Sequence, residues 1–377
     1  MKIEQKMWSY QSGWSPNKPG DLNSKADLVF IFGATALLKD QKTFQELKSA
    51  YPKAHILGCS TAGEIYGTQV TDEALIVTAV HFDHAAVKSA RIQLNPGESS
   101  FQAGQRIMEM LDKNDLRHVF LLSDGVHVNG SELVKGLTSL MPADVSVTGG
   151  LSGDGDRFKE TFVLSDDVGR VDTVAVVGLY GSRLKVNYCS AGGWEPFGPQ
   201  RLVTRSKANV LFELDHQSAL ALYKEYLGDY AKKLPASGQS FPLSLKTKHD
   251  EWVIRSVLAV NENDQSMTFA GDVPEGAYVR LMTANPEGLI QGARQAAQGS
   301  MVRAGSAPEL AILTTCVGRK MVLGQRVEEE VEIVREVFGD NTVITGFYSY
   351  GEISPFAAQG SCELHNQTMA ITTLAEV

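Results

Sequence analysis

The chain has 377 residues, which is long enough for two domains. Of these residues 43% are hydrophobic and 21% charged, a composition typical of globular proteins. Its formal net charge of −9 disfavours nucleic acid or an anionic membrane as a partner, because both bind basic surfaces. The apolar runs are too short to cross a bilayer and the four cysteines form no C-x-x-C pair, so we expect a reducing, cytoplasmic location.

The first predicted elements form a strand–helix–strand unit. An apolar strand over residues 28–33 is followed by a helix over 43–52, where apolar residues recur three and four apart. A short β-rich run then leads into the stretch GCSTAGE, in which Gly58, Gly63 and Glu64 form the pattern G-x-x-x-x-G-acid. A further strand over 74–82 completes the unit.

The same unit occurs twice more along the chain. The second copy has its glycine pattern at Gly150, Gly155 and Asp156, and the third has it at Gly346, Gly351 and Glu352. Their flanking strands and helices are predicted at 119–125, 131–142 and 173–181, and at 310–316, 325–340 and 368–376, with an extra helix before each at 100–113 and 286–305. Three such units predict an α/β protein of mixed α+β type, with core elements that were duplicated.

The region between the second and third units has a different character. Residues 189–206 are rich in glycine, proline and aromatic residues and are interpreted as a crossing between two similar halves. After it come a strand, a turn at Asp215 and His216, and an amphipathic helix. Residues 251–282 predict three strands without an intervening helix, which favours antiparallel pairing in mixed sheets.

The first glycine turn raises the question of a catalytic nucleophile, either Cys59 or Ser60. A nucleophile elbow has the form G-x-S-x-G, and this stretch has Ala62 where the last glycine belongs. The other two turns carry Leu151 and Phe347 at the position of Cys59, so glycines that serve backbone geometry are the favoured interpretation.

Acidic residues and histidines supply the remaining candidates. Five carboxylates are candidates for acid/base or ligand-binding roles, although acidic residues after a glycine often only bond to turn amides; they are Glu64, Asp124, Asp154, Asp156 and Glu352. Among the histidines, His127 follows a strand end, His365 precedes the final strand, and His216 lies in a turn. A neutral imidazole can hold a haem iron, but spacing alone does not select one of them.

Several stretches in order resemble the FIST family, whose amino- and carboxy-terminal domains occur in tandem in bacterial signal-transduction proteins. They are GCSTAGEI, SDGVHVNGSELVKGL, VTGGLSGDGDRF, FELDHQSALALYKEYLG, TGFYSYGEISP and CELHNQTMAITTL. The resemblance implies a FIST N-type domain over 27–208 and a FIST C-type domain over 209–377. It also implies a sensory protein for a small ligand that is not an enzyme.

Two-domain FIST proteins of this length resemble bacterial nitric-oxide sensors that hold haem through a histidine and regulate a separate histidine kinase or cyclic-di-GMP enzyme. The resemblance therefore implies haem as cofactor, with His365 as the first candidate for the iron ligand and His127 and His216 after it. Where the family usually has a glycine and often a proline, this chain has His216, Gln217 and Ser218.

Two alternatives stay open at the level of sequence. A FIST sensor without haem would bind a metabolite such as an amino acid, and a hydrolase would use Cys59 or Ser60. The residues predicted to line a small-ligand site are Cys59, Ser60, Glu64, Asp154, Tyr348 and Glu352. Sequence also leaves open whether the three glycine turns surround one ligand or mark three corners of the fold.

Overall fold

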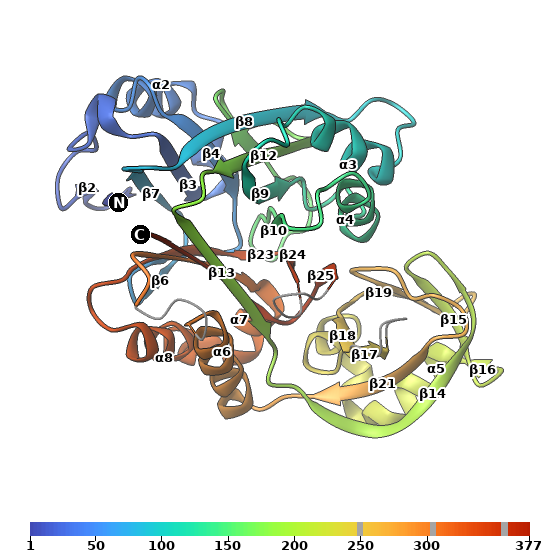
Figure 1. The fold of residues 1–377 in the computed structure, drawn as a ribbon. Helices are drawn as coiled ribbons and strands as arrows, with labels where there is room; N and C mark the ends of the chain where they lie inside the picture. Colours follow the sequence, from blue (N-terminus) through green and yellow to red (C-terminus); the bar gives the residue numbers. More distant parts are fainter. Residues whose placement is uncertain (247–251, 302–306, 356–360) are drawn as a thin grey trace.

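The fold is described from a computed structural model of the chain, in which residues 1–246, 252–301, 307–355 and 361–377 are placed. Within these ranges the strands form three sheets of six strands and one of eight. Figure 1 shows the eight-stranded sheet, drawn in yellow-green to orange, as a body beside the part of the molecule that holds the other three sheets.

The first sheet has the strand order β11-β4-β3-β7-β1-β2 and is built mainly from the first unit. Its strands are β1 (Lys2–Ser9), β2 (Gly13–Ser15), β3 (Leu28–Gly33), β4 (His55–Ser60), β7 (Ala74–His81) and β11 (Val163–Ser165). Its helical segments are η1 (Asn23–Lys25), α1 (Thr35–Leu38) and α2 (Gln41–Ala50). Strands β3 and β4 are parallel and are connected through α2, which begins where the Asp40 side chain accepts the amide hydrogens of Lys42 and Thr43.

The second and third sheets repeat this plan. The second, in the order β25-β24-β10-β9-β12-β8, contains β8 (Ala86–Gln93), β9 (Leu116–Ser123), β10 (Ser146–Leu151), β12 (Thr173–Tyr180), β24 (Gly351–Pro355) and β25 (Cys362–His365), with helices α3 (Ser100–Glu109) and α4 (Gly130–Thr138). The third, in the order β13-β26-β22-β23-β5-β6, contains β5 (Glu64–Tyr66), β6 (Gln69–Thr71), β13 (Leu184–Ala191), β22 (Leu310–Cys316), β23 (Val343–Ser349) and β26 (Met369–Glu376). Its helices are α6 (Pro286–Met301), α7 (Val317–Leu323), η4 (Gly324–Arg326) and α8 (Glu329–Phe338).

The three units exchange strands in a closed cycle. The strand that follows the first glycine turn, β5, pairs with β23 of the third unit, and β24 of the third unit pairs with β10 of the second. Strand β11 of the second unit pairs with β4 of the first. Each sheet is therefore completed by a strand from another unit, so the repeat depends on all three copies being present.

Alternating side chains place the core between the three sheets. In β3, Leu28, Phe30 and Phe32 face a central cluster, while Val29 and Ile31 pack against the helical layer that contains α2. The Phe32 ring stacks on Phe347 of β23 with a centroid distance of 4.6 Å. Because both faces of these strands are covered, they are continuous apolar runs without polar alternation.

The eight-stranded sheet is a separate antiparallel layer inserted between β13 and α6. Its strands are β14 (Glu195–Lys207), β15 (Val210–Leu214), β16 (Gln217–Ser218), β17 (Leu243–Lys246), β18 (Trp252–Arg255), β19 (Val257–Asn261), β20 (Ser266–Phe269) and β21 (Tyr278–Thr283). Its helical segments are α5 (Ala219–Leu227), η2 (Gly228–Lys233) and η3 (Ala236–Ser240). Leu220 and Tyr223 of α5 pack into the apolar core of this layer, which also includes Phe269.

The predicted class is confirmed as a mixed α+β fold with strand–helix–strand units and mixed sheets. The helix-free run after residue 251 pairs antiparallel, as predicted, although it forms four strands and not three. The end of the helix predicted over 286–305 lies outside the described residues after Met301. Within the described ranges, no helix is long and apolar enough to cross a membrane.

Candidate functional site

The three glycine turns meet at one junction, which we call the turn junction and define as residues 58–64, 149–156 and 346–352. The Ala62 amide donates to the Tyr348 carbonyl oxygen and the Tyr348 amide donates to the Gly63 carbonyl oxygen, both at 2.8 Å. The Gly153 amide donates to the Ser60 carbonyl oxygen at 2.9 Å. These backbone amides bind one another's turns, so they are already used within the protein.

Close strand contact explains one glycine in each turn. A Cβ atom on Gly58, Gly149 or Gly346 would lie 2.3, 1.8 or 2.1 Å from a backbone carbonyl oxygen of the neighbouring parallel strand. In the second unit the residue at this position is therefore Gly149, one residue before the Gly150 that the sequence pattern selects. Gly149 also has a φ of 144°, which side chains rarely tolerate.

The acids of the junction are buried and bonded within the protein. Glu64 accepts from the Thr61 hydroxyl at 2.6 Å and Glu352 accepts from the Ser349 hydroxyl at 2.8 Å, so the two occupy matching places. Burial raises the pKa of Glu64 to about 7 and that of Glu352 to about 8. Asp154 instead accepts the amide hydrogens of Phe158, Lys159 and Glu160 and shapes a longer loop.

The candidate nucleophiles and Tyr348 are also buried. Cys59 and Ser60 are both 0% exposed, and burial raises the pKa of the Cys59 thiol well above its ordinary value. The Ser60 hydroxyl accepts the Phe162 amide hydrogen at 2.8 Å. The Tyr348 hydroxyl donates to Glu330, whose carboxylate also pairs with the fully buried Arg319. These side chains hold the junction together.

A cavity of about 500 Å³ lies where the eight-stranded sheet meets the second and third sheets. Its wall is mostly apolar and includes Trp194, Trp252, Ile254 and Met282, together with Arg280 and His365. His365 ends β25 and is 2% exposed. Its Nε2 lies 2.9 Å from the Ser354 carbonyl oxygen, and burial lowers the pKa of His365 to about 4. The imidazole is therefore neutral near pH 7.

Arg280 brings a positively charged side chain to the wall of this cavity. Its Nε atom is buried and has no hydrogen-bond partner among the described residues. The charge of the guanidinium would favour an anionic or carbonyl ligand in the cavity. The residue lies on β21, next to strands β14 and β17 that also border the cavity.

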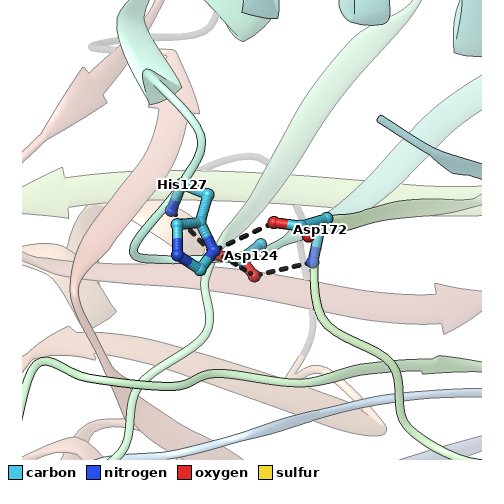
Figure 2. A group of neighbouring side chains, drawn as sticks. All are labelled: Asp124, His127 and Asp172. Atoms are coloured by element: carbon cyan, nitrogen blue, oxygen red, sulfur yellow. Dashed lines mark hydrogen bonds and ion pairs between the residues drawn. The ribbon is translucent and has the colours of Figure 1, made fainter. Parts of the chain in front are cut away.

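The other two candidate haem ligands lie elsewhere. His127 is half exposed in the loop after β9, where its Nδ1 is 2.9 Å from an oxygen of Asp172 and 3.5 Å from one of Asp124 (Figure 2). His216 is exposed between β15 and β16 with a φ of 62°, and its amide donates to the Thr204 hydroxyl. Of the three histidines, His365 is the one that borders the 500 Å³ cavity.

Family models match the chain in two consecutive segments. The FIST N domain matches residues 27–217 and the FIST C domain matches residues 219–355. The chain belongs to the FIST family. FIST domains are small-ligand sensing domains of signal transduction, which confirms the sensory role expected from sequence. The exact division at 208/209 stays a prediction, because β14 and β15, on either side of it, belong to one sheet.

Similarity to individual proteins adds little about the ligand of this FIST protein. An uncharacterized protein of Methanocaldococcus jannaschii is 23% identical over 297 residues, which are 70% of this chain and 55% of that protein. The chain thus spans about half the length of that relative. A solved structure titled as a cyanuric acid hydrolase from A. caulinodans aligns over 100% of this chain and 98% of its own, with 10% identity and a TM-score of 0.36.

Sequence reasoning missed most of the cavity wall of this FIST protein. Trp252, Ile254, Arg280 and Met282 lie on strands of the inserted sheet, where alternating apolar residues indicate only packing. Trp194 belongs to the stretch 189–206, which is rich in glycine, proline and aromatic residues, and part of that stretch borders the cavity. The feature of the sequence that could have indicated a cavity here is the mixture of glycine and aromatic residues in this stretch, just before the strand-rich insertion.

Proposed function

We propose that this FIST protein is a haem-based nitric oxide sensor, with the haem bound in the cavity that His365 borders. The observation that carries the proposal is a buried, neutral histidine on the wall of a mostly apolar cavity between two parts of the fold. A volume of about 500 Å³ falls within the range of small-molecule and cofactor sites, which is about 300–1,000 Å³.

The residues present suit haem in two respects. His365 donates Nε2–H to the Ser354 carbonyl oxygen, an arrangement that orients metal-binding histidines. The guanidinium of Arg280, a residue of the cavity wall, suits a propionate carboxylate. When bound, haem supplies an iron atom to which a small gas binds. In this proposal His365 orients the cofactor, Trp194 and Met282 exclude water from it, and Arg280 pairs with the negative charge of a propionate.

The signal is proposed to pass to a separate protein. As the family resemblance implies, the partner is a histidine kinase or a cyclic-di-GMP enzyme. The buried Arg319 offers a route inside the chain, since it donates to the carbonyl oxygen of Gly192 on the cavity wall and to Glu330, which binds Tyr348 of the turn junction. A change at the cavity would thereby reach all three units.

Haem reconstitution tests the proposal. The parent protein is expected to show a Soret band that shifts on addition of nitric oxide. His365→Gln, which keeps a donor for the Ser354 carbonyl oxygen, is expected to lose the specific band, and His216→Gln serves as the matched control that keeps it. No specific band in the parent would refute haem binding. An unchanged band in the His365 variant would refute this residue as the ligand.

A second candidate function is sensing of a carboxylate-bearing metabolite, such as an amino acid, without haem. It is favoured by the positive charge of Arg280 on the cavity wall, whereas the amides of the turn junction are used within the protein. Such a ligand would raise the melting temperature in a screen of amino acids, because it binds only the folded state. The rise is expected to vanish in Arg280→Met, and a screen without any Arg280-dependent rise would exclude this function.

We also propose that the protein is not an enzyme that uses Cys59 or Ser60. A thiol that is 0% exposed with a raised pKa stays protonated, and thiolate is the reactive form. The native protein is therefore expected to resist thiol- and serine-directed reagents at these residues. Labelling of the folded protein that is lost in Cys59→Ala or Ser60→Ala would contradict the proposal.

A further inference from the structure

A second group of potential ligand atoms lies outside the cavity, at the ends of two neighbouring strands. Asp124 and His127 follow β9, and Asp172 precedes β12, which pairs antiparallel with β9. One ligand atom from each of the three residues lies within 4.8 Å of the other two. Figure 2 shows the His127 ring and the Asp172 carboxylate directed toward each other, with Asp124 between their loops.

The group is held in place by the backbone. The Asp124 side chain is 0% exposed, and its Oδ1 accepts the amide hydrogens of Val126 and His127 at 2.7 and 2.9 Å. Its Oδ2 accepts the Asp172 amide hydrogen at 2.9 Å. One buried carboxylate thus fixes the two loops that carry the other two side chains, and a site ordered before binding loses less entropy when a ligand enters.

We propose that Asp124, His127 and Asp172 form a binding site for a divalent transition-metal ion such as Zn²⁺. Imidazole nitrogens and carboxylate oxygens are both donors that such ions bind in proteins, and water can fill the remaining positions. Tetrahedral zinc with bonds near 2.1 Å separates its ligand atoms by about 3.4 Å. The distances from His127 Nδ1, 2.9 and 3.5 Å, bracket that value.

Accessibility fits an exchangeable ion. The side chains of His127 and Asp172 are 49% and 44% exposed, so an ion has a path from solvent and room for water ligands. Asp124 Oδ2 accepts the Asp172 amide hydrogen with one lone pair, and it also lies near His127 Nδ1, so a second lone pair can bind an ion.

Two variants test the site without disturbing its support. His127→Ala and Asp172→Asn both keep the backbone amide that donates to Asp124, so the fold is expected to be preserved and is checked by circular dichroism. His84→Ala, which removes an exposed histidine elsewhere, is the matched control. The full chain, without a polyhistidine tag and treated with chelator, is titrated with Zn²⁺ by calorimetry and with Co²⁺ by visible absorption.

The parent is expected to bind one equivalent of Zn²⁺, with at least a tenfold weaker affinity in each site variant and an unchanged affinity in His84→Ala. Absence of binding by the parent would overturn the proposal, and so would equal affinity in the parent and both site variants. The result is independent of haem, since His365→Gln is expected to leave Zn²⁺ affinity unchanged. Failure of the metal site is thereby distinguished from failure of the haem proposal.

Discussion

Removing the guanidinium of Arg319 is expected to destabilise the protein severely. This side chain is 0% exposed and connects three segments that are distant in sequence. It donates to the Glu330 carboxylate at 2.7 and 3.0 Å, to the Leu289 carbonyl oxygen at 2.8 Å and to the Gly192 carbonyl oxygen. The substitution Arg319→Met keeps most of the apolar volume and deletes all of these donors.

The expected loss follows from the charge that stays behind. Breaking a buried ion pair by removing one partner costs about 3–5 kcal/mol, because the other charge is left uncompensated. Glu330 is 0% exposed, and its other contacts, from the Tyr348 and Thr315 hydroxyls, do not neutralise it. Native proteins have free energies of unfolding of about 5–15 kcal/mol, so the variant is expected to retain only a fraction of the parent's stability.

Chemical denaturation of parent, Arg319→Met and the double variant Arg319→Met/Glu330→Met measures this energy. The double variant is expected to recover a large part of the loss, since no unpaired charge remains. Arg326→Met removes an exposed pair with Glu287 and Glu329 and is expected to change the midpoint little. The reasoning is refuted if Arg319→Met is as stable as Arg326→Met, or if the double variant is no more stable than the single one.

Two further predictions concern the turn junction. Because burial raises the folded-state pKa of Glu64 to about 7 and of Glu352 to about 8, the folded chain keeps protons that the unfolded chain has released above pH 4.5. The free energy of unfolding should therefore fall as pH rises through 6.5–8, by up to about 1.4 kcal/mol per pH unit and group. This window lies above the pH range in which the lowered pKa values of the buried histidines make the free energy of unfolding depend on pH. Urea titrations at several pH values should show that the free energy of unfolding falls less steeply with pH in Glu352→Gln than in the parent. An equally steep fall in both proteins would contradict the role of Glu352. Separately, Gly149→Ala places a Cβ 1.8 Å from the Leu121 carbonyl oxygen and should cost at least about 2 kcal/mol, measured by denaturation. Gly97→Ala, with a φ of 80° and open space around it, should cost less, and equal losses would count against the close-contact argument.

Much of the local structure could be predicted from the sequence because its causes are local. Apolar runs such as 28–33 and 310–316 formed strands, and the three- and four-residue periodicity around 131–142 formed a helix. Gly58 and Gly346 marked places where two backbones approach too closely for a side chain. The resemblance carried by the motifs was confirmed by the FIST N and FIST C matches.

The site was less accessible from sequence because its residues come from distant parts of the chain. The sequence shows that His365 precedes the last strand, yet much of the cavity wall that it borders comes from the inserted sheet, with Arg280 and Trp252. His127 was noted as a residue at a strand end, whereas its contact with Asp172 depends on the pairing of β9 with β12. No spacing along the chain encodes either contact.

By itself, the sequence determined three repeated units, their strands and helix, and the family to which the chain belongs. Only the tertiary structure decided that each unit gives one strand to another, so that β5, β11 and β24 close a cycle around the turn junction. The physical reason is that strands covered on both faces are all apolar runs, so their composition does not indicate which neighbouring strand each will pair with. Their partners are selected by packing of the whole molecule, and the cavity and the turn junction exist only once that packing is complete.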